Sequence, residues 1–205
     1  MALTVVIGDI HGCYNQLMEL MDKVYTWNDD PKKFIFLGDY VDRGPDSAKV
    51  VQYMIDHPEF ICLKGNHEDM MLAGDQMWWM NGGNKTYDSY KEVSKEKVEE
   101  HLEWMRNLPT IYEDEHRIYV HAGLMPGVAL EDQTEHVKLW IRDEFLNNQY
   151  DFGKLVIHGH TPRRQVDIQP NRINLDTAGV FGGKFTAAFF KDGVRDLYQY
   201  IDVNG

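Results

Sequence analysis

One pattern recurs three times in the first half of the chain and limits the folds open to it. An apolar run ends in a glycine, a polar cluster follows, and a stretch with helical spacing comes next. The apolar runs are residues 3–7, 34–37 and 60–63. Because they are continuous rather than alternating, they are typical of strands buried on both faces. The helical stretches between them indicate parallel βαβ units, so the pattern predicts an α/β fold around a buried parallel sheet.

The rest of the chain predicts one domain over residues 1–205 with a small helical insertion. Residues 76–109 combine the run Met77–Met80, the breaker Gly82-Gly83 and a charged helix from about residue 89 to residue 106. Further strands are expected at residues 117–120, 155–157, 172–175, 185–190 and 194–201. The sequence has neither an internal repeat nor a clear linker. We therefore expect a helical cap inserted at about residues 76–109 of a single domain.

Polar side chains follow the predicted strands where each strand ends. In an open α/β sheet these ends meet at one crevice, which is the usual ligand site. Collecting them brings together Asp9, His11, Asp39, Asn66, His121 and His160. Carboxylates, imidazoles and an amide, without a thiolate, suit divalent ions such as Mn²⁺, Fe or Zn²⁺. Six ligands exceed one tetrahedral site but fit two metals about 3.5–4 Å apart that share a bridging carboxylate.

Composition excludes several classes of partner. Lys and Arg number 21 against 33 Asp and Glu, and the formal charge is −12. This balance argues against binding to nucleic acid or anionic lipid through a general basic surface. No apolar run approaches the roughly 18 residues of a membrane span, and the N-terminus lacks the features of a signal peptide. Two cysteines, Cys13 and Cys62, fit a reducing compartment as buried apolar side chains. We expect a cytoplasmic protein.

Five segments resemble a known family. Residues 8–12 (GDIHG), 38–44 (GDYVDRG), 65–68 (GNHE), 121–123 (HAG) and 158–160 (HGH) are similar to the motifs of calcineurin-like metallophosphoesterases. They resemble most closely the phosphoprotein phosphatase (PPP) branch with its bacterial and phage members, and the resemblance spans about residues 8–190. It implies two β-sheets packed face to face between helices, an α/β/β/α sandwich with the metals at its top.

The resemblance also implies a division of the ligands between two metal ions. Asp9 and His11 would hold the first ion, and Asp39 would bridge both. The second ion would be held by Asn66, His121 and His160. Mn²⁺ is the leading expectation for the metal, with Fe, Zn²⁺ or Ni²⁺ as alternatives. Between two such ions a bound water loses a proton near neutral pH and becomes a hydroxide that can attack phosphorus in line.

Four further residues would complete the chemistry. His67 follows the ligand Asn66 and would be the general acid for the departing oxygen, and Asp42 would orient its imidazole. Arg43 and Arg142 would bind the phosphate oxygens through charge-assisted hydrogen bonds. Arg163 and Arg164 are alternatives to Arg142. Position 162 is a proline where many metallophosphoesterases carry a histidine, a feature shared with the PPP branch.

Other conspicuous residues receive plainer interpretations. We expect His158 to be a packed histidine at a strand end. The run Met77–Met80 is expected to pack in the core or the cap, with an aromatic wall over the site as the alternative. The remaining histidines are expected at the surface, namely His57, His101, His116 and His136.

The resemblance implies a metal-dependent phosphomonoester hydrolase. The leading hypothesis is a serine/threonine protein phosphatase that acts on phosphorylated proteins or peptides and releases inorganic phosphate, with phosphotyrosine left open. The alternative is a symmetrical dinucleoside tetraphosphate hydrolase or another nucleotide phosphoesterase of the same superfamily. A nuclease fits poorly with a charge of −12 and no basic groove. A catalytically inactive metal-binding module would require a missing ligand or acid, and none is missing.

Overall fold

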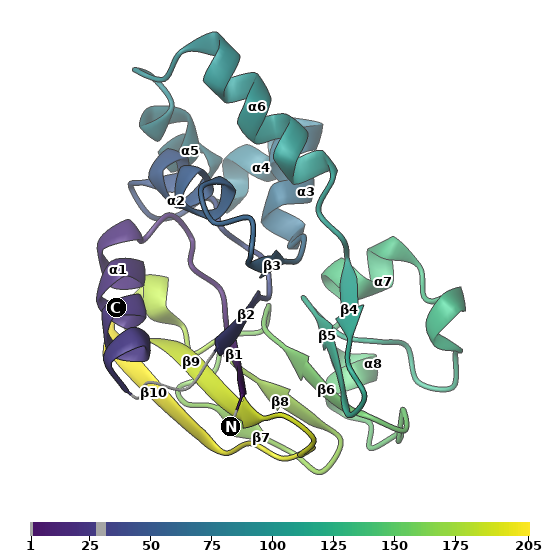
Figure 1. Ribbon diagram of the computed structural model, residues 1–205. Helices are drawn as coiled ribbons and strands as arrows, with labels where there is room; N and C mark the ends of the chain where they lie inside the picture. The colour runs from purple at the N-terminus through teal and green to yellow at the C-terminus, as the bar shows by residue number, and fades with distance from the viewer. Residues whose placement is uncertain (1, 28–31) are drawn as a thin grey trace.

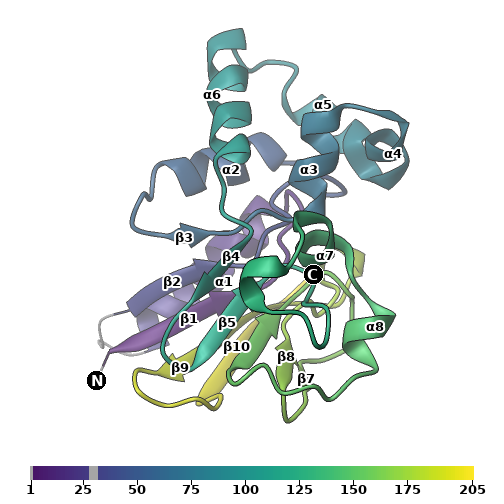
Figure 2. The same ribbon diagram turned by 90° about the vertical axis from the view of Figure 1, so that its right-hand side faces the viewer.

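Two mixed five-stranded sheets lie face to face in the computed structural model, which describes residues 2–27 and 32–205. The remaining residues of the expected domain, 1 and 28–31, lie outside this description. The first sheet has the order β10-β9-β1-β2-β3 and the second the order β4-β5-β6-β8-β7. Figures 1 and 2 show the two sheets side by side, with helices on both outer faces. The α/β sandwich expected from the resemblance is confirmed.

The first sheet contains the parallel strands expected from the N-terminal pattern. These are β1 (Leu3–Ile7), β2 (Lys32–Phe36) and β3 (Ile61–Cys62). Next to β1, however, lies β9 (Lys184–Lys191), which is antiparallel to it and also pairs with β10 (Gln199–Asn204). The parallel arrangement expected of the first three strands is confirmed, and the antiparallel β9 and β10 make the sheet as a whole mixed. The final strand also begins later than expected, at Gln199 rather than residue 194.

The second sheet is mixed in the same way. Its parallel centre consists of β5 (Arg117–Val120), β6 (Leu155–His158) and β8 (Arg172–Asn174). Antiparallel strands close both edges, β4 (Ile111–Glu113) beside β5 and β7 (Asp167–Ile168) beside β8. The carboxyl ends of β5 and β6 consequently lie next to each other.

Burial on both faces explains why the strands are continuously apolar. Alternate residues of β1 point to opposite sides: Val6 packs between the sheets, whereas Val5 and Ile7 pack against helices. In β5, Tyr119 faces the space between the sheets and Ile118 faces outward into a third cluster. Three apolar layers therefore hold four layers of secondary structure together.

Helices cover the outer faces of both sheets. Against the first sheet pack α1 (Tyr14–Trp27) and α2 (Ser47–Ile55), and against the second pack α7 (Glu135–Trp140) and α8 (Asp143–Leu146). Short 3₁₀ turns lie at Leu130–Asp132 and Gly179–Phe181. Within the described ranges, none of the helices combines the length and apolarity needed to cross a membrane.

A group of helices stands above one end of the sheets in Figures 1 and 2. It comprises α3 (Asn66–Ala73), α4 (Gln76–Trp78), the π turn η1 (Trp79–Gly83), α5 (Asn84–Ser89) and α6 (Lys95–Arg106). The charged helix expected from residue 89 begins only at Lys95, because the Ser94 hydroxyl caps it by accepting the Lys97 N–H.

One histidine in this group corrects a sequence-based expectation. His101 is buried rather than at the surface. Its Nδ1 lies 2.8 Å from the Tyr90 hydroxyl and its Nε2 lies 3.1 Å from Gln52 Oε1. Two polar partners satisfy both ring nitrogens, so the histidine can be buried at little cost.

The buried carboxylate of Glu68 joins α3 to the loop that follows β2. It accepts hydrogen bonds from the backbone N–H groups of Asp39 (2.9 Å), Tyr40 (2.7 Å) and Gly65 (2.9 Å). Gly65 is required here because a Cβ would lie 2.2 Å from Asp39 Oδ1. Burial raises the pKa of Glu68 to about 7, and the backbone donors oppose that shift. Glu68 therefore sets the position of Asp39 relative to the start of α3.

We expect Glu68→Gln to destabilise the protein. The amide has half the acceptor capacity of the carboxylate and turns an N–H donor toward backbone N–H groups. Losing hydrogen bonds to a charged acceptor should lower the free energy of unfolding by roughly 2 kcal/mol or more, measured by urea denaturation. Exposed Glu115→Gln is the matched control and should change stability by less than about 0.5 kcal/mol. Equal stabilities of the two variants would contradict this role.

Candidate metal centre

The six predicted ligands lie together at the carboxyl ends of the strands. They follow β1, β2, β3, β5 and β6, and all are buried, none being more than 8% exposed. The set consists of Asp9, His11, Asp39, Asn66, His121 and His160. The convergence expected from the strand ends is therefore present, and it draws on both sheets.

Asp39 lies at the centre of the cluster. Its Oδ2 is 3.5 Å from His11 Nε2, and its Oδ1 is 3.4 Å from His121 Nε2. Two groups of side chains could each hold a metal ion, with donor atoms within 4.8 Å of one another: His11, Asp39 and His67, and Asp39, His121 and His160. Because Asp39 belongs to both, its two carboxylate oxygens can serve two neighbouring ions.

Hydrogen bonds hold two of the imidazoles in the form that binds metals. Nδ1 of His11 lies 2.9 Å from the Val41 carbonyl oxygen, and Nδ1 of His121 lies 2.9 Å from that of Leu37. Donation by Nδ1–H places the Nε2 lone pair on the side of Asp39, which is the usual orientation of a metal-binding histidine. Burial lowers the pKa of His121 to about 3 and that of His11 well below its ordinary value, so both rings are neutral.

The Asn66 side chain completes the second group. Its Oδ1 lies 2.8 Å from His121 Nε2 and 2.9 Å from His160 Nδ1. Asn66 is the first residue of α3, directly after the Gly65 held by Glu68. An amide oxygen and two imidazole nitrogens therefore converge beside Asp39.

Asp9 lies at the edge of the cluster rather than within either compact group. Both of its carboxylate oxygens accept the backbone N–H of His160 at 3.2 Å. Burial, and secondarily the nearby Asp176 carboxylate, raises the pKa of Asp9, and burial also raises that of Asp39. Buried carboxylates close together are costly unless cations compensate them. Divalent ions coordinated by oxygen and nitrogen fit this requirement and this donor set.

His67 and Asp42 form a buried pair next to the cluster. His67 Nδ1 lies 2.7 Å from Asp42 Oδ2, and its Nε2 faces Asp39 Oδ2 at 4.0 Å. Burial disfavours the charged form of each group, so it lowers the pKa of His67 to about 2 and raises that of Asp42 to about 6. The imidazolium form of His67 therefore depends on the Asp42 carboxylate as its counter-ion.

Two guanidinium groups border the cluster. Arg43 Nη1 contacts His11 Nε2, and the Arg43 guanidinium lies 5.1 Å from the Phe181 ring. Arg142 Nε donates to His160 Nε2 at 3.2 Å. Arg163 instead is exposed and lies 4.0 Å from Asp167 Oδ2. The structure thus brings Arg43 and Arg142, but not Arg163, against the ligands.

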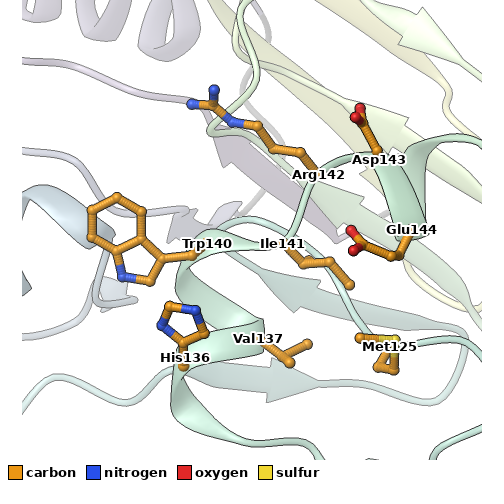
Figure 3. Close-up of a pocket in the computed structure, with 8 residues that line it drawn as sticks. All are labelled: Met125, His136, Val137, Trp140, Ile141, Arg142, Asp143 and Glu144. Atoms are coloured by element: carbon orange, nitrogen blue, oxygen red, sulfur yellow. The ribbon is translucent and has the colours of Figure 1, made fainter.

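A surface pocket of about 360 Å³ adjoins Arg142. Figure 3 shows Trp140 and His136 on one side of it and Asp143 and Glu144 on the other. The Trp140 ring lies 6.2 Å from that of His160. Trp140 therefore lines this pocket and also lies near the predicted ligand His160.

The backbone is strained at the site. Among the described residues, the non-glycine residues with positive φ are His11, Asp39, Asp42, Arg43, His160 and Ala178. All but Ala178 are predicted site residues. Left-handed backbone costs about 1–2 kcal/mol per residue and persists where surrounding contacts over-determine it, which is typical of functional sites.

The run Met77–Met80 differs from its predicted packing. Met77, Trp79 and Met80 are exposed, by 51%, 46% and 77%. Trp78 alone turns inward, and its Nε1–H donates to Asp42 Oδ1 at 2.8 Å. Thr86, which carried no signal in the sequence, donates its hydroxyl to the same oxygen at 2.7 Å. In the sequence, the neighbouring Gly82-Gly83 pair is the one local feature that could have indicated a close approach of this segment to another part of the chain.

Other predictions about buried residues are confirmed. His158 is fully buried at the end of β6, with its ring 5.1 Å from that of Phe145. Cys13 and Cys62 are buried free thiols. The buried Asp176, which follows β8, lies close enough to Asp9 to influence its pKa.

Comparison with known proteins identifies the family of the chain. The profile of the calcineurin-like phosphoesterases matches residues 3–197. The chain is 32% identical to serine/threonine-protein phosphatase 1 of Salmonella typhimurium over 89% of each chain. It is 28% identical to the asymmetrical bis(5'-nucleosyl)-tetraphosphatase PrpE of Anoxybacillus flavithermus, over 89% of this chain and 88% of that protein.

Solved structures share the fold. A crystal structure described provisionally as a diadenosine tetraphosphatase superposes with a TM-score of 0.77 at 25% identity, covering 99% of this chain and 93% of the other. A Saccharomyces cerevisiae serine/threonine phosphatase superposes with a TM-score of 0.69 at 18% identity, covering 99% and 79%. With His and Asp groups suited to metal ions at its centre, the chain belongs to the calcineurin-like phosphoesterases and is a metal-dependent phosphoesterase.

Proposed function

We propose that the chain is a dinuclear phosphomonoesterase that removes phosphate from phosphoserine and phosphothreonine in proteins. The observation that carries the proposal is the buried His67–Asp42 pair at 2.7 Å, directed at the ligand cluster. A serine or threonine alkoxide is a poor leaving group and needs a proton as the P–O bond breaks. An imidazole held by a carboxylate is equipped to supply it.

The ligand assignment is part of the same proposal. Asp9 and His11 would hold one ion, Asn66, His121 and His160 would hold the other, and Asp39 would serve both. Oxygen and nitrogen donors favour Mn²⁺ over thiophilic metals. When bound, the two ions supply a hydroxide for attack on phosphorus and neutralise charge on the phosphoryl oxygens.

The remaining steps belong to side chains of the protein. Arg43 and Arg142 donate hydrogen bonds to the phosphate oxygens from two sides of the cluster. His67 transfers its Nε2 proton to the leaving oxygen as the bond from that oxygen to phosphorus breaks. Asp42 keeps its hydrogen bond to Nδ1 and orients the ring throughout. The products are the free hydroxyl side chain and inorganic phosphate.

The surroundings of the site support a protein substrate. The 32% identity to the Salmonella typhimurium protein phosphatase extends over 89% of each chain. The net charge of −12 disfavours the binding of long polyanions to the surface beyond the two arginines.

We further propose that the chain is a single domain with residues 76–109 as its cap. We also propose a cytoplasmic location, which the two free thiols support because reducing compartments preserve them.

Hydrolysis of dinucleoside tetraphosphates is the second candidate. The 28% identity to the asymmetrical tetraphosphatase of Anoxybacillus flavithermus favours it. So do two aromatic side chains at the rim, Phe181 beside Arg43 and Trp140 beside His160, since nucleobases stack on such rings. The two candidates share metals and arginines and differ in the leaving group.

Direct competition between substrates separates these candidates. We expect kcat/KM for a phosphothreonine peptide to exceed that for a dinucleoside tetraphosphate at equal Mn²⁺ and salt. The Asp39→Asn protein, purified in parallel, controls for contaminating phosphatases. A tenfold preference for the dinucleotide, about 1.4 kcal/mol of transition-state stabilisation, would replace the first candidate with the second.

Removing the bridging charge should remove metal and activity together. Because Asp39 serves both ions, Asp39→Asn should lower bound metal from two ions per chain to one or none. Turnover should fall by about 100-fold or more, as for other losses in a metal site. Metal analysis of the purified protein and phosphatase assays measure both quantities. Exposed Asp69→Asn on α3 is the control, and near-normal metal content in Asp39→Asn would refute the bridging role.

The role of His67 should depend on the leaving group. p-Nitrophenolate leaves without a proton, so His67→Asn should reduce turnover of p-nitrophenyl phosphate only modestly. With phosphothreonine the loss should reach about 10²–10⁴-fold, the usual contribution of a general acid. His116→Asn is the control. Equal losses on both substrates would instead assign His67 to binding or metal positioning.

A further inference from the structure

The two oxygens of the Asp42 carboxylate have different partners. Oδ2 faces His67 Nδ1 at 2.7 Å, while Oδ1 accepts hydrogen bonds from Trp78 Nε1 (2.8 Å) and Thr86 Oγ1 (2.7 Å). Both donors come from the segment 78–86, here called the cap turn, which lies 36 and 44 residues further along the chain. Asp42 is fully buried. Its side-chain orientation is therefore set by the cap turn rather than by its own loop.

The cap turn also holds the backbone of the same loop. Thr86 Oγ1 accepts the N–H of Asp42 at 2.8 Å and lies 3.0 Å from Ser47 Oγ. Because the single Thr86 hydroxyl hydrogen points to Asp42 Oδ1, the Ser47 hydroxyl must be the donor to Thr86. This fixes one orientation of the whole network. Asp42 has φ 72°, a conformation that such contacts must maintain.

Arg43 is held by the same segment. Its N–H donates to the Gly82 carbonyl oxygen at 3.3 Å. Gly82 has φ 101°, and a Cβ there would lie 2.9 Å from both the backbone N and Cγ of Arg43. A Cβ on Gly83 would lie 2.7 Å from the Trp78 ring. Two glycines therefore allow the cap turn to approach the loop closely enough for Trp78 to reach Asp42.

We propose that Trp78 and Thr86 are positioning residues for the general acid: they orient Asp42 so that the His67 imidazole presents Nε2 to the leaving oxygen. The inference rests on the proposed role of His67. As the P–O bond breaks, the proton passes from Nε2 to the leaving oxygen, and Asp42 Oδ2 retains the Nδ1 hydrogen. Neither positioning residue exchanges a proton with the substrate.

A merely structural role makes a different kinetic prediction. If the two donors only fasten the cap to the sheets, losing one lowers stability and affects all substrates alike. If they orient the acid, the loss grows with the need of the leaving group for a proton. The ratio of losses on two substrates therefore distinguishes the roles.

The experiment uses conservative changes in the metal-loaded protein. Trp78→Phe removes the indole N–H and keeps an aromatic ring, and Thr86→Val removes the hydroxyl and keeps the shape. We expect kcat to fall about 10-fold on a phosphothreonine peptide, the equivalent of one hydrogen bond to a charged group. On p-nitrophenyl phosphate it should fall less than twofold, and KM should stay nearly constant on both substrates.

Two further variants control for folding and chemistry. Thr86→Ser retains the hydroxyl and should restore most of the phosphothreonine activity lost in Thr86→Val. Tyr90→Phe removes another hydrogen bond in the same helical region, to His101 at 2.8 Å, without contact to Asp42, and should leave the substrate ratio unchanged. Thermal unfolding of each variant identifies those that fold. If Trp78→Phe does not fold, the Thr86 pair carries the test.

A double-mutant cycle completes the experiment. In an Asp42→Asn background, Trp78→Phe should cost little more on phosphothreonine, since residues acting as one unit are not additive. Equal losses on both substrates, or additive losses in the cycle, would overturn the inference. If the activity loss depends on the leaving group in His67→Asn but not in the Trp78 and Thr86 variants, the positioning inference is overturned and the acid role of His67 stands. If the loss in His67→Asn does not depend on the leaving group, both the acid role and the positioning inference are overturned.

Discussion

Burial of acidic side chains where the strands end is the constraint on which the rest of the molecule depends. Asp9 and Asp39 lie in a region from which water is largely excluded, together with neutral imidazoles. Anions held there require compensating cations. The oxygen and nitrogen donors of the cluster suit divalent cations, and the two arginines at its border add positive charge. Each motif ends a different strand, which brings these groups together. The sandwich provides the rigid support, since its apolar layers fix the strand ends.

Hydrogen bonds, rather than apolar packing, set the details of the site. Glu68 holds the Asp39 loop by accepting backbone N–H groups, and the cap turn holds Asp42 and Arg43 in left-handed conformations. Each contact offsets conformational strain in a loop that must turn a side chain toward the cluster. The orientation of the loops around the cluster thus comes from polar groups other than the six predicted ligands.

Much of the site could be predicted because strand ends carry a local signal. Asp39 and His121 each follow a continuous apolar run, and such runs identify strands buried on both faces. The direction of a strand relative to its neighbour could not be predicted in the same way, since residues 185–190 are as apolar as β1 yet run antiparallel to it. Trp78 and Thr86 were missed for another reason. Their partner, Asp42, lies 36 and 44 residues away, and nothing in the run Met77–Met80 distinguishes the one side chain that turns inward.

The hydrogen bond from the His160 backbone to Asp9 spans 151 residues and joins the end of β6 to the end of β1. Contacts of such sequence separation carry a loop-closure cost, because the chain must bring two distant segments together before they contribute. A chain that has completed only the first three strands carries Asp9, His11, Asp39 and Asn66 but lacks His121 and His160, which follow β5 and β6. The complete cluster therefore exists only once both sheets have docked, and it belongs to the finished tertiary structure rather than to any separable fragment.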